Sequence, residues 1–154
     1  MTPAVFVAKC DIGRGLFAAG PISAGAEILT LSGPLLTLRQ VRAKGALAAN
    51  ALQVGIDRYL DLAEPGRLIN HSCAPNVGIK DDVRLVALAD IAAETELRFD
   101  YSTTIGDGWT MPCRCGAVHC RGLISAYHLL PAELRLRYAL LGLVQRFLLE
   151  AWEA

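Results

Sequence analysis

Residues 67–76 read Arg67-Leu68-Ile69-Asn70-His71-Ser72-Cys73-Ala74-Pro75-Asn76, and they carry more information about the fold than any other stretch of the chain. The segment is polar and tight, and Pro75 fixes a turn because its ring sets the backbone φ angle. Taken singly, each residue has an ordinary explanation; His71, for example, would be a core histidine with its hydrogen bonds satisfied. The segment therefore has to be interpreted together with the rest of the chain.

Short apolar runs separated by turn residues extend on both sides of this segment. They predict strands at residues 5–8, 26–31, 52–55, 59–62, 77–80, 83–88 and 94–100. Asp81-Asp82 predicts a hairpin turn between two of these strands. Many short strands with frequent turns indicate a mainly β domain.

Two segments predict helices. Residues 37–49 fit a helix with Thr37 as its N-cap and Gly45 as its weak point. Near the C-terminus, apolar residues recur every three or four positions after Pro131, which predicts one amphipathic helix that packs on the body of the same domain. Its apolar positions are Leu134, Tyr138, Leu141, Val144, Leu148 and Trp152.

Three of the five cysteines lie close together, at Cys113, Cys115 and Cys120. In a reducing compartment such a cluster predicts a metal site rather than disulfides, and zinc takes four such ligands in a tetrahedron. The fourth ligand has three candidates, which are Cys73, His119 and Cys10. The alternative is a group of buried free cysteines.

The loop Gly13-Arg14-Gly15-Leu16-Phe17-Ala18 formally matches the dinucleotide fingerprint G-x-G-x-x-A. That fingerprint needs a helix directly after it, and Gly20, Pro21 and Gly25 break any helix there. The acidic residue expected about twenty positions later is also missing. We therefore reject a Rossmann unit, although the glycines can still bring the backbone close to a ligand.

Length and composition exclude several classes of protein. The 154 residues fit one domain, and 53% hydrophobic residues are too many for a disordered chain. Lys+Arg and Asp+Glu are both 15, so the basic excess typical of nucleic-acid-binding proteins is missing and we do not expect such binding. No secretory signal or membrane span is recognisable, and we expect a soluble, cytoplasmic (intracellular) protein.

Four segments together resemble SET-domain protein-lysine methyltransferases. Residues 13–17 resemble the family's G-x-G loop, residues 67–76 its R-F-I-N-H-S-C-x-P-N segment and Glu96-Leu97-Arg98-Phe99-Asp100-Tyr101 its E-L-x-F-D-Y segment. Residues 113–122 resemble its cysteine-rich post-SET tail. The order and rough spacing agree over about residues 4–124.

The resemblance implies a mainly β, β-clip-like SET fold in which the segments around residues 70 and 100 meet in a knot-like crossing. It divides the chain into a SET domain (1–108), a post-SET zinc-binding tail (109–124) and a C-terminal helical extension (125–154). The implied activity is methyl transfer from S-adenosylmethionine to a lysine side chain of a protein substrate, with one structural zinc.

Family roles carry over to matching positions. Tyr101 would be the catalytic residue, and Phe99 would line the lysine channel. The residues implied to bind S-adenosylmethionine are Arg14, Gly15, Asn70, His71, Tyr101 and Leu123. Those implied to bind zinc are Cys73, Cys113, Cys115 and Cys120.

The chain also departs from better-known members. Leu31 stands where the family often carries a channel tyrosine, and Tyr59 is a candidate replacement. Residues 37–50 are also short compared with the family's usual substrate-reading insert. A degenerate SET domain that binds proteins without turnover is therefore an alternative, and a small zinc scaffold without a ligand cleft is another. Twelve arginines against three lysines indicate a bacterial, GC-rich source. The oligomeric state is left open.

Overall fold

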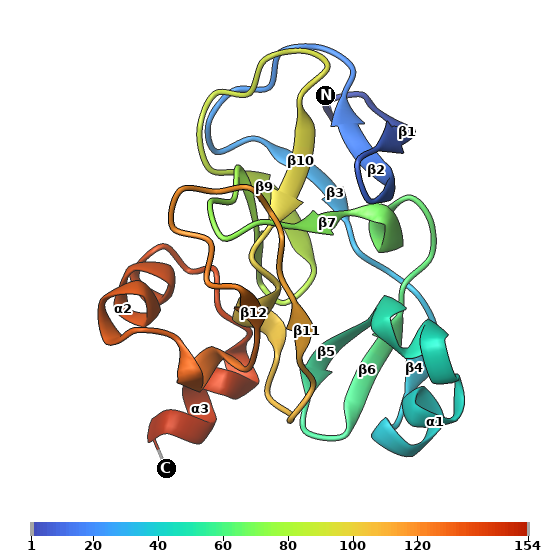
Figure 1. Ribbon diagram of the computed structural model, residues 1–154, viewed down its shortest axis with the longest axis vertical. Helices are drawn as coiled ribbons and strands as arrows, with labels where there is room; N and C mark the ends of the chain where they lie inside the picture. The colour runs from blue at the N-terminus through green and yellow to red at the C-terminus, as the bar shows by residue number, and fades with distance from the viewer. Residues whose placement is uncertain (1, 154) are drawn as a thin grey trace.

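The computed structural model describes residues 2–153, and short strands make up most of its regular structure, which confirms the predicted mainly β fold (Figure 1). The strands form four small sheets rather than one large sheet. Within the described residues, no helix has the length and apolar character needed to cross a membrane.

The first sheet has the strand order β1-β2-β10-β7. Its strands are β1 (Val5–Cys10), β2 (Gly13–Ala18), β10 (Glu96–Phe99) and β7 (Asn70–His71). β7 runs parallel to β10, with Asn70 opposite Arg98 and His71 opposite Phe99. Two segments that are far apart in the sequence therefore lie side by side, as the resemblance implies (Figure 1).

The other sheets are antiparallel, with the strand orders β3-β9-β8, β4-β6-β5 and β11-β12. Their strands are β3 (Glu27–Thr30), β4 (Leu35–Leu36), β5 (Ala51–Gly55), β6 (Arg58–Asp61), β8 (Val77–Lys80), β9 (Arg84–Ala87), β11 (Met111–Pro112) and β12 (Leu123–Ile124). The predicted hairpin turn joins β8 to β9, and Asp81 and Asp82 both adopt positive φ angles of 49° and 68°. Aspartate tolerates this conformation better than most residues.

The helix predicted over residues 37–49 begins where expected but is shorter. Thr37 caps α1 (Leu38–Ala43): its hydroxyl accepts from the Gln40 N–H, and the Gln40 side chain accepts from the Thr37 N–H. Gly45 then takes a φ of 61° and starts the 3-10 helix η1 (Gly45–Asn50). Further 3-10 turns are η2 (Gly66–Leu68), η3 (Tyr101–Thr104) and η4 (Tyr127–Leu129).

The prediction of one C-terminal helix is wrong, because two helices stand there: α2 (Ala132–Leu140) and α3 (Arg146–Glu153). Gly142, at φ 73°, ends α2. Its N–H bonds the Ala139 carbonyl, and the Leu143 N–H bonds the Tyr138 carbonyl, which is the Schellman pattern. Leu141, predicted on the packed face, is 49% exposed. The predicted contact through the Trp152 side chain lies outside the described residues.

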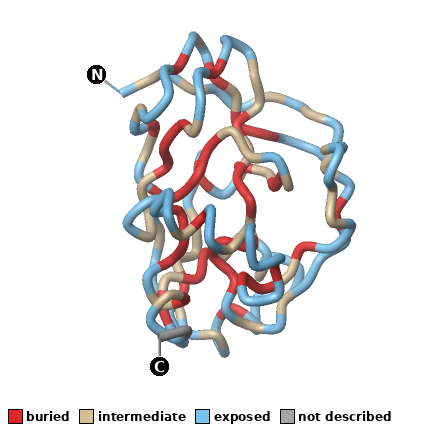
Figure 2. The backbone as a smooth tube through the Cα atoms, turned by 90° about the vertical axis from the view of Figure 1, so that its left-hand side faces the viewer, coloured by how far each residue is buried: buried red, intermediate tan, exposed pale blue. Residues whose placement is uncertain are grey.

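Buried segments run through the middle of the molecule, with exposed turns around them (Figure 2). The main core joins the first sheet to the β3-β9-β8 sheet and includes Leu16, Leu97, Val77 and Leu85, all fully buried. A second cluster packs the C-terminal helices against Val86 of β9, and its members from that region are Tyr127, Leu130, Tyr138, Leu143, Val144 and Leu148.

Candidate functional site

Tyr101 begins η3 directly after β10, and its hydroxyl and backbone are both held by the β7 segment. The hydroxyl donates to the Ile69 carbonyl oxygen at 2.6 Å, and the backbone N–H donates to Nδ1 of His71 at 3.0 Å. Its ring lies 4.8 Å from the Phe99 ring, centroid to centroid. Burial raises the pKa of Tyr101 above its ordinary value, so the hydroxyl stays protonated at neutral pH.

His71 connects Tyr101 to the cysteine cluster. Because a backbone N–H can only donate, Nδ1 is the accepting nitrogen, and the proton of the neutral ring lies on Nε2. Nε2 is 3.4 Å from Cys73 Sγ, so this proton faces a sulfur acceptor. Burial lowers the pKa of His71 to about 4, although the nearby Asp100 carboxylate acts in the opposite direction. The imidazole is therefore neutral and has a single tautomer.

Asn70 ties β7 to the glycine loop. Its Nδ2 donates to the Arg14 carbonyl oxygen at 3.0 Å and to Glu96 Oε2 at 3.1 Å, and Cys10 Sγ lies 3.4 Å away. A Cβ added to Gly15 would lie 2.9 Å from the Glu96 carboxyl group and 3.2 Å from Asn70 Nδ2. Only glycine permits this close approach, so the structure brings Arg14, Gly15 and Asn70 together.

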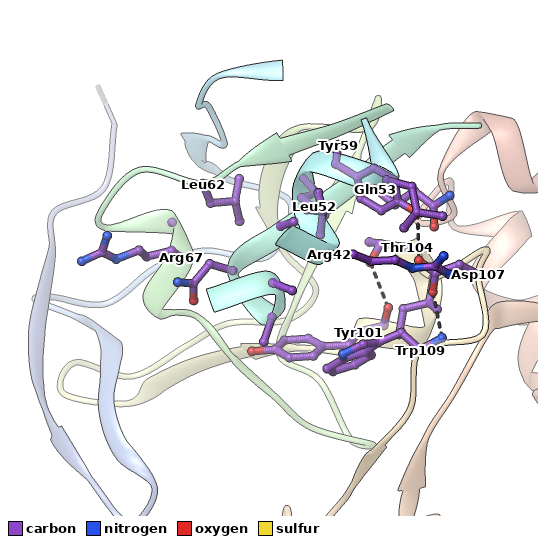
Figure 3. Close-up of a pocket in the computed structure, with 18 of the residues that line it drawn as sticks. Arg42, Leu52, Gln53, Tyr59, Leu62, Arg67, Tyr101, Thr104, Asp107 and Trp109 are labelled. Carbon is purple, nitrogen blue, oxygen red and sulfur yellow. Dashed lines mark hydrogen bonds between the residues drawn. The ribbon is translucent and has the colours of Figure 1, made fainter. Parts of the chain in front are cut away.

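A cavity of about 340 Å³ opens on another side of Tyr101 (Figure 3). Phe99 and Tyr101 line it together with residues from α1, η1, β5 and β6 and from the loop after η3. Arg14 and Asn70 do not line it. Tyr101 therefore faces this cavity, which we call the channel, while its backbone and hydroxyl are attached to the segment that carries Asn70 and His71.

The channel has a second tyrosine, Tyr59 of β6. Its hydroxyl donates to Asp107 Oδ2 at 2.8 Å, and the Trp109 N–H donates to Asp107 Oδ1 at 2.9 Å. Burial, reinforced by the hydrogen bond to the carboxylate, raises the pKa of Tyr59. Leu31 does not line the channel: it is 2% exposed in the core, where its Cδ2 would lie 2.7 Å from a Cβ on Gly66. The second tyrosine that lines this cavity is therefore Tyr59 of β6, and the Leu31 position does not reach it.

Asp100, next to Tyr101, is a buried carboxylate with three donors. It accepts from the Tyr138 hydroxyl at 2.8 Å, from the Arg121 guanidinium at 2.8 Å and from the Ser102 N–H at 3.1 Å. A buried charge is tolerated only when it is paired in this way. Asp100 therefore connects the turn of Tyr101 to the cysteine-rich segment and to α2.

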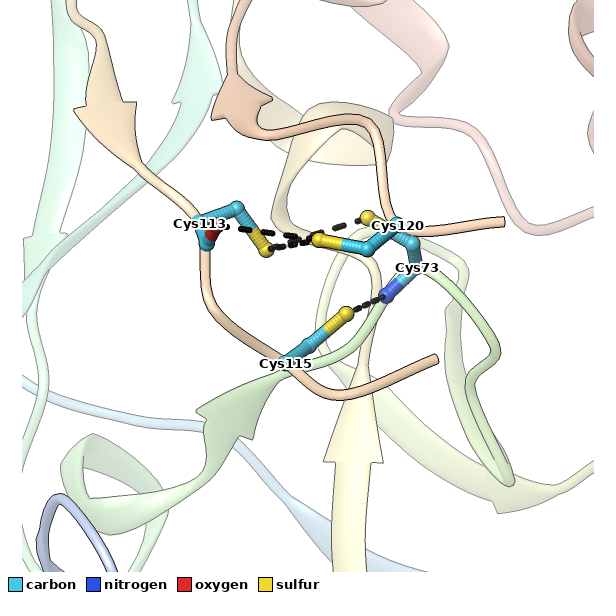
Figure 4. Close-up of side chains that lie close together, drawn as sticks. All are labelled: Cys73, Cys113, Cys115 and Cys120. Atoms are coloured by element: carbon cyan, nitrogen blue, oxygen red, sulfur yellow. Dashed lines mark hydrogen bonds between the residues drawn. The ribbon is translucent and has the colours of Figure 1, made fainter. Parts of the chain in front are cut away.

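Four cysteines converge although one of them lies far from the others in the sequence (Figure 4). The sulfurs of Cys73, Cys113, Cys115 and Cys120 all lie within 4.8 Å of one another. Cys10 lies instead beside Asn70, and exposed His119 is not part of the group, so Cys73 is the fourth member.

The geometry of this group fits a tetrahedral metal. Zinc–sulfur bonds of about 2.3 Å in a regular tetrahedron separate neighbouring sulfurs by about 3.8 Å. The Cys113 sulfur lies 3.8 Å from that of Cys73 and 3.6 Å from that of Cys120. Two backbone N–H groups also point at sulfurs: that of Cys73 at Cys115 and that of Arg121 at Cys73, both at 3.4 Å. Such bonds stabilise thiolates that hold a metal.

Leu123, predicted as a cofactor contact, lies in β12 opposite Pro112 with 47% of its surface exposed. It comes directly after the cysteine-rich segment, and its role stays a prediction. Sequence reasoning missed Asp107, Trp109 and Tyr138: Asp107 and Tyr138 have hydrogen-bond partners far away in the chain, and Trp109 bonds Asp107 within the same loop. The one available signal was Trp109, one of two tryptophans, in the loop that follows the F-D-Y motif.

Comparison with known protein families finds one matching family model, described as "SET domain", over residues 13–102. The matched range begins at the glycine loop and ends after Tyr101. It contains Gly15, Asn70, His71 and Phe99, and the cysteine-rich segment lies beyond it.

A histone-lysine N-methyltransferase from Eremothecium gossypii, described as H3 lysine-4 specific, is 32% identical over 142 residues, covering 80% of this chain and 15% of that protein. The chain thus spans a small part of the relative's length. Among solved structures, Arabidopsis thaliana SUVH6 in complex with SAM has a TM-score of 0.66 at 23% identity, covering 79% of this chain and 33% of that one. KRYPTONITE in complex with mCHH DNA, an H3(1-15) peptide and SAH has a TM-score of 0.64 at 22% identity, covering 80% and 30%.

Proposed function

The chain belongs to the SET domain family, and on that premise we propose that it transfers a methyl group from S-adenosylmethionine to the side-chain amine of a lysine in a protein. The observation that carries the proposal is the position of Tyr101. It lines a channel on one side and is hydrogen-bonded on the other to the segment that holds Asn70 and His71. The relatives support a protein substrate, since one is named for histone H3 and one was solved with an H3 peptide.

S-adenosylmethionine, when bound, supplies a methyl group on a cationic sulfonium. We assign its binding to a set of residues around the glycine loop and the β7 and β10 segments: the backbone of Arg14 and Gly15, together with Asn70, His71, Tyr101 and Leu123. The Asn70 side chain donates to the Arg14 carbonyl and to the Glu96 carboxylate, and Glu96 is in turn paired with Arg98, so Asn70 is held in one orientation. Asn70 itself is only partly buried, so this polar group can be reached by a ligand.

The channel side would position the lysine and keep it neutral. Free lysine has a pKa of about 10.4, and a dry channel beside a cation disfavours its charged form. The Tyr101 hydroxyl already donates its proton to the Ile69 carbonyl, so its free lone pairs can accept from the amine N–H. Orientation of this kind is the main requirement of an in-line methyl transfer.

We further propose that residues 109–124 form a post-SET tail and that one zinc ion, held by Cys73, Cys113, Cys115 and Cys120, attaches it to the SET core. The sulfur separations support this assignment. A bound zinc would fix Cys73, and through His71 it would also fix the backbone of Tyr101.

The proposal is tested by incubating the protein with S-adenosylmethionine carrying a radiolabelled methyl group and a lysine-containing lysate. Label should appear in protein, and Tyr101→Phe should lower the rate about a hundredfold, the usual cost of removing one oriented hydrogen-bonding group. Thermal unfolding and metal content check that the variant is folded. Full activity of folded Tyr101→Phe would refute the mechanism.

The alternative is a degenerate domain that binds proteins without turnover, and it rests on Leu31 and on the short insert at residues 37–50. The Leu31 argument is weakened because Leu31 lies in the core while Tyr59 lines the channel; the short insert stays as its second ground. Calorimetry of S-adenosylmethionine binding together with the methyl-transfer assay separates the two functions, since a pure binding module would transfer no methyl group even when S-adenosylmethionine binds. An intracellular location and a bacterial source stay predictions from composition, and genome context together with fractionation of the source cells would test them.

A further inference from the structure

A second cavity, of about 600 Å³, lies directly beside the channel; we call it the side groove. Four residues line both spaces: Leu38, Gln53, Tyr59 and Asp107. The side groove therefore shares a wall with the channel that we assign to the target lysine. The groove is placed to receive substrate residues that flank a side chain inserted into the channel.

One wall of the side groove is the turn between β5 and β6, which consists of Ile56 and Asp57. Two-residue turns usually carry Gly, Asn, Asp or Ser, yet Ile56 stands here with 78% of its surface exposed. The turn is fixed in place, because Asp57 Oδ1 accepts from the Leu38 N–H at 2.8 Å. The structure thus holds a large aliphatic side chain in water at the edge of the groove.

Another part of the lining comes from residues after the matched SET region, chiefly Phe147 and Leu148 of α3. Gly106, in the loop that carries Asp107, allows this part to come close: a Cβ there would lie 2.6 Å from the Phe147 ring. α3 is therefore packed against the channel loop, and its apolar side chains line the groove.

The charged groups of the side groove have one sign. Among the described residues that line it, the charged side chains are Asp57 and Asp107, and the remaining titratable groups are His128 and two tyrosines. This suits a segment that contains a basic target residue and carries apolar side chains beside it. It does not suit an acidic segment.

We infer that the side groove binds the substrate residues next to the target lysine and selects a bulky apolar side chain there. The inference rests on the proposed function, and it names a substrate class: lysines with a Leu-, Ile- or Phe-type neighbour in an extended, non-acidic segment. Ile56 and Phe147 both line the site with apolar side chains.

The test uses short fluorescein-labelled peptides with one central lysine in a Gly-Ser-Ala background, in which a single flanking position at a time is changed to Leu. Both binding and methyl transfer are measured. At one flanking position, Leu should improve binding and kcat/KM about tenfold, the usual effect of burying one such side chain. Ile56→Ser should remove most of that preference.

The matched control is Leu140→Ser on α2. Leu140 is also 78% exposed but lies outside the side groove, so its variant should keep the wild-type preference. The inference would be overturned if the wild type bound and methylated all peptides equally well, or if Ile56→Ser kept the wild-type preference for Leu. These results leave the proposed function intact if lysine is still methylated. Leu-dependent binding without any methyl transfer would instead refute the proposed function, while the assignment of the side groove as a peptide-binding site would stand.

Discussion

Replacing Tyr138 by phenylalanine removes one buried hydroxyl from the second core cluster and nothing else. That hydroxyl donates to Asp100 Oδ2 at 2.8 Å, and both residues are at most 2% exposed. Phenylalanine fills the same space, so no large cavity forms. The variant therefore isolates a single hydrogen bond to a buried carboxylate.

The size of the effect follows from the charge of the acceptor. Hydrogen bonds to charged groups contribute about 1.5–3 kcal/mol each. Asp100 keeps Arg121 and the Ser102 N–H after the change, so a value near the middle of that range applies. We expect Tyr138→Phe to lower the free energy of unfolding by about 2 kcal/mol and the melting temperature by about 6 °C.

Tyr127→Phe is the matched control. Its hydroxyl also bonds at 2.8 Å, but the acceptor is the neutral Arg135 carbonyl. Such a bond contributes about 1 kcal/mol, so this variant should lose about half as much. Urea unfolding of both proteins, monitored by circular dichroism, gives the comparison. If Tyr138→Phe loses no more than Tyr127→Phe, the charge on Asp100 does not strengthen the bond and the argument fails.

Three further predictions concern the metal site, the glycine loop and alkaline pH. The wild type should carry one zinc per chain, measured by atomic absorption, which Cys73→Ser should lose and Cys10→Ser should retain; equal zinc in both variants would contradict the proposed four-cysteine site. Gly15→Ala should weaken S-adenosylmethionine binding about tenfold in calorimetry because its Cβ meets Glu96, whereas Gly20→Ala, with open space at its Cβ, should not. Burial raises the pKa of all four tyrosines above the ordinary value of about 10, so the free energy of unfolding should be unaffected by them below that pH and should fall as the pH rises further. Phenolate absorbance should appear only when the protein unfolds, and its appearance in the folded protein would contradict this.

The parts of the site that sequence predicted are those that contiguous motifs encode. The segments around Asn70 and Tyr101 are short and specific, and their pairing through β7 and β10 follows from the resemblance. The turn at Asp81 and Asp82 was predictable because aspartate tolerates positive φ angles. The cysteine group was also within reach, although spacing alone did not choose Cys73 over the other candidates.

Other features depend on contacts that no local pattern reports. The apolar stripe near the C-terminus continues through Gly142, so its period suggested one helix, yet a glycine in the left-handed region ended α2. The partnership of Tyr59 with Asp107 joins a strand to a loop far along the chain, and the bond from Tyr138 to Asp100 does the same from a helix. Pairings of this length are decided by the packed fold rather than by neighbouring residues.

The separation between Cys73 and the other three cysteines has a consequence during protein synthesis. A ribosome adding about 5–20 residues per second needs roughly 2–9 s to proceed from Cys73 to Cys120. For that interval the nascent chain carries the thiol of Cys73 without its three companions. Expression in zinc-poor or oxidising cells should therefore damage the newly made protein far more than the same treatment damages the mature protein.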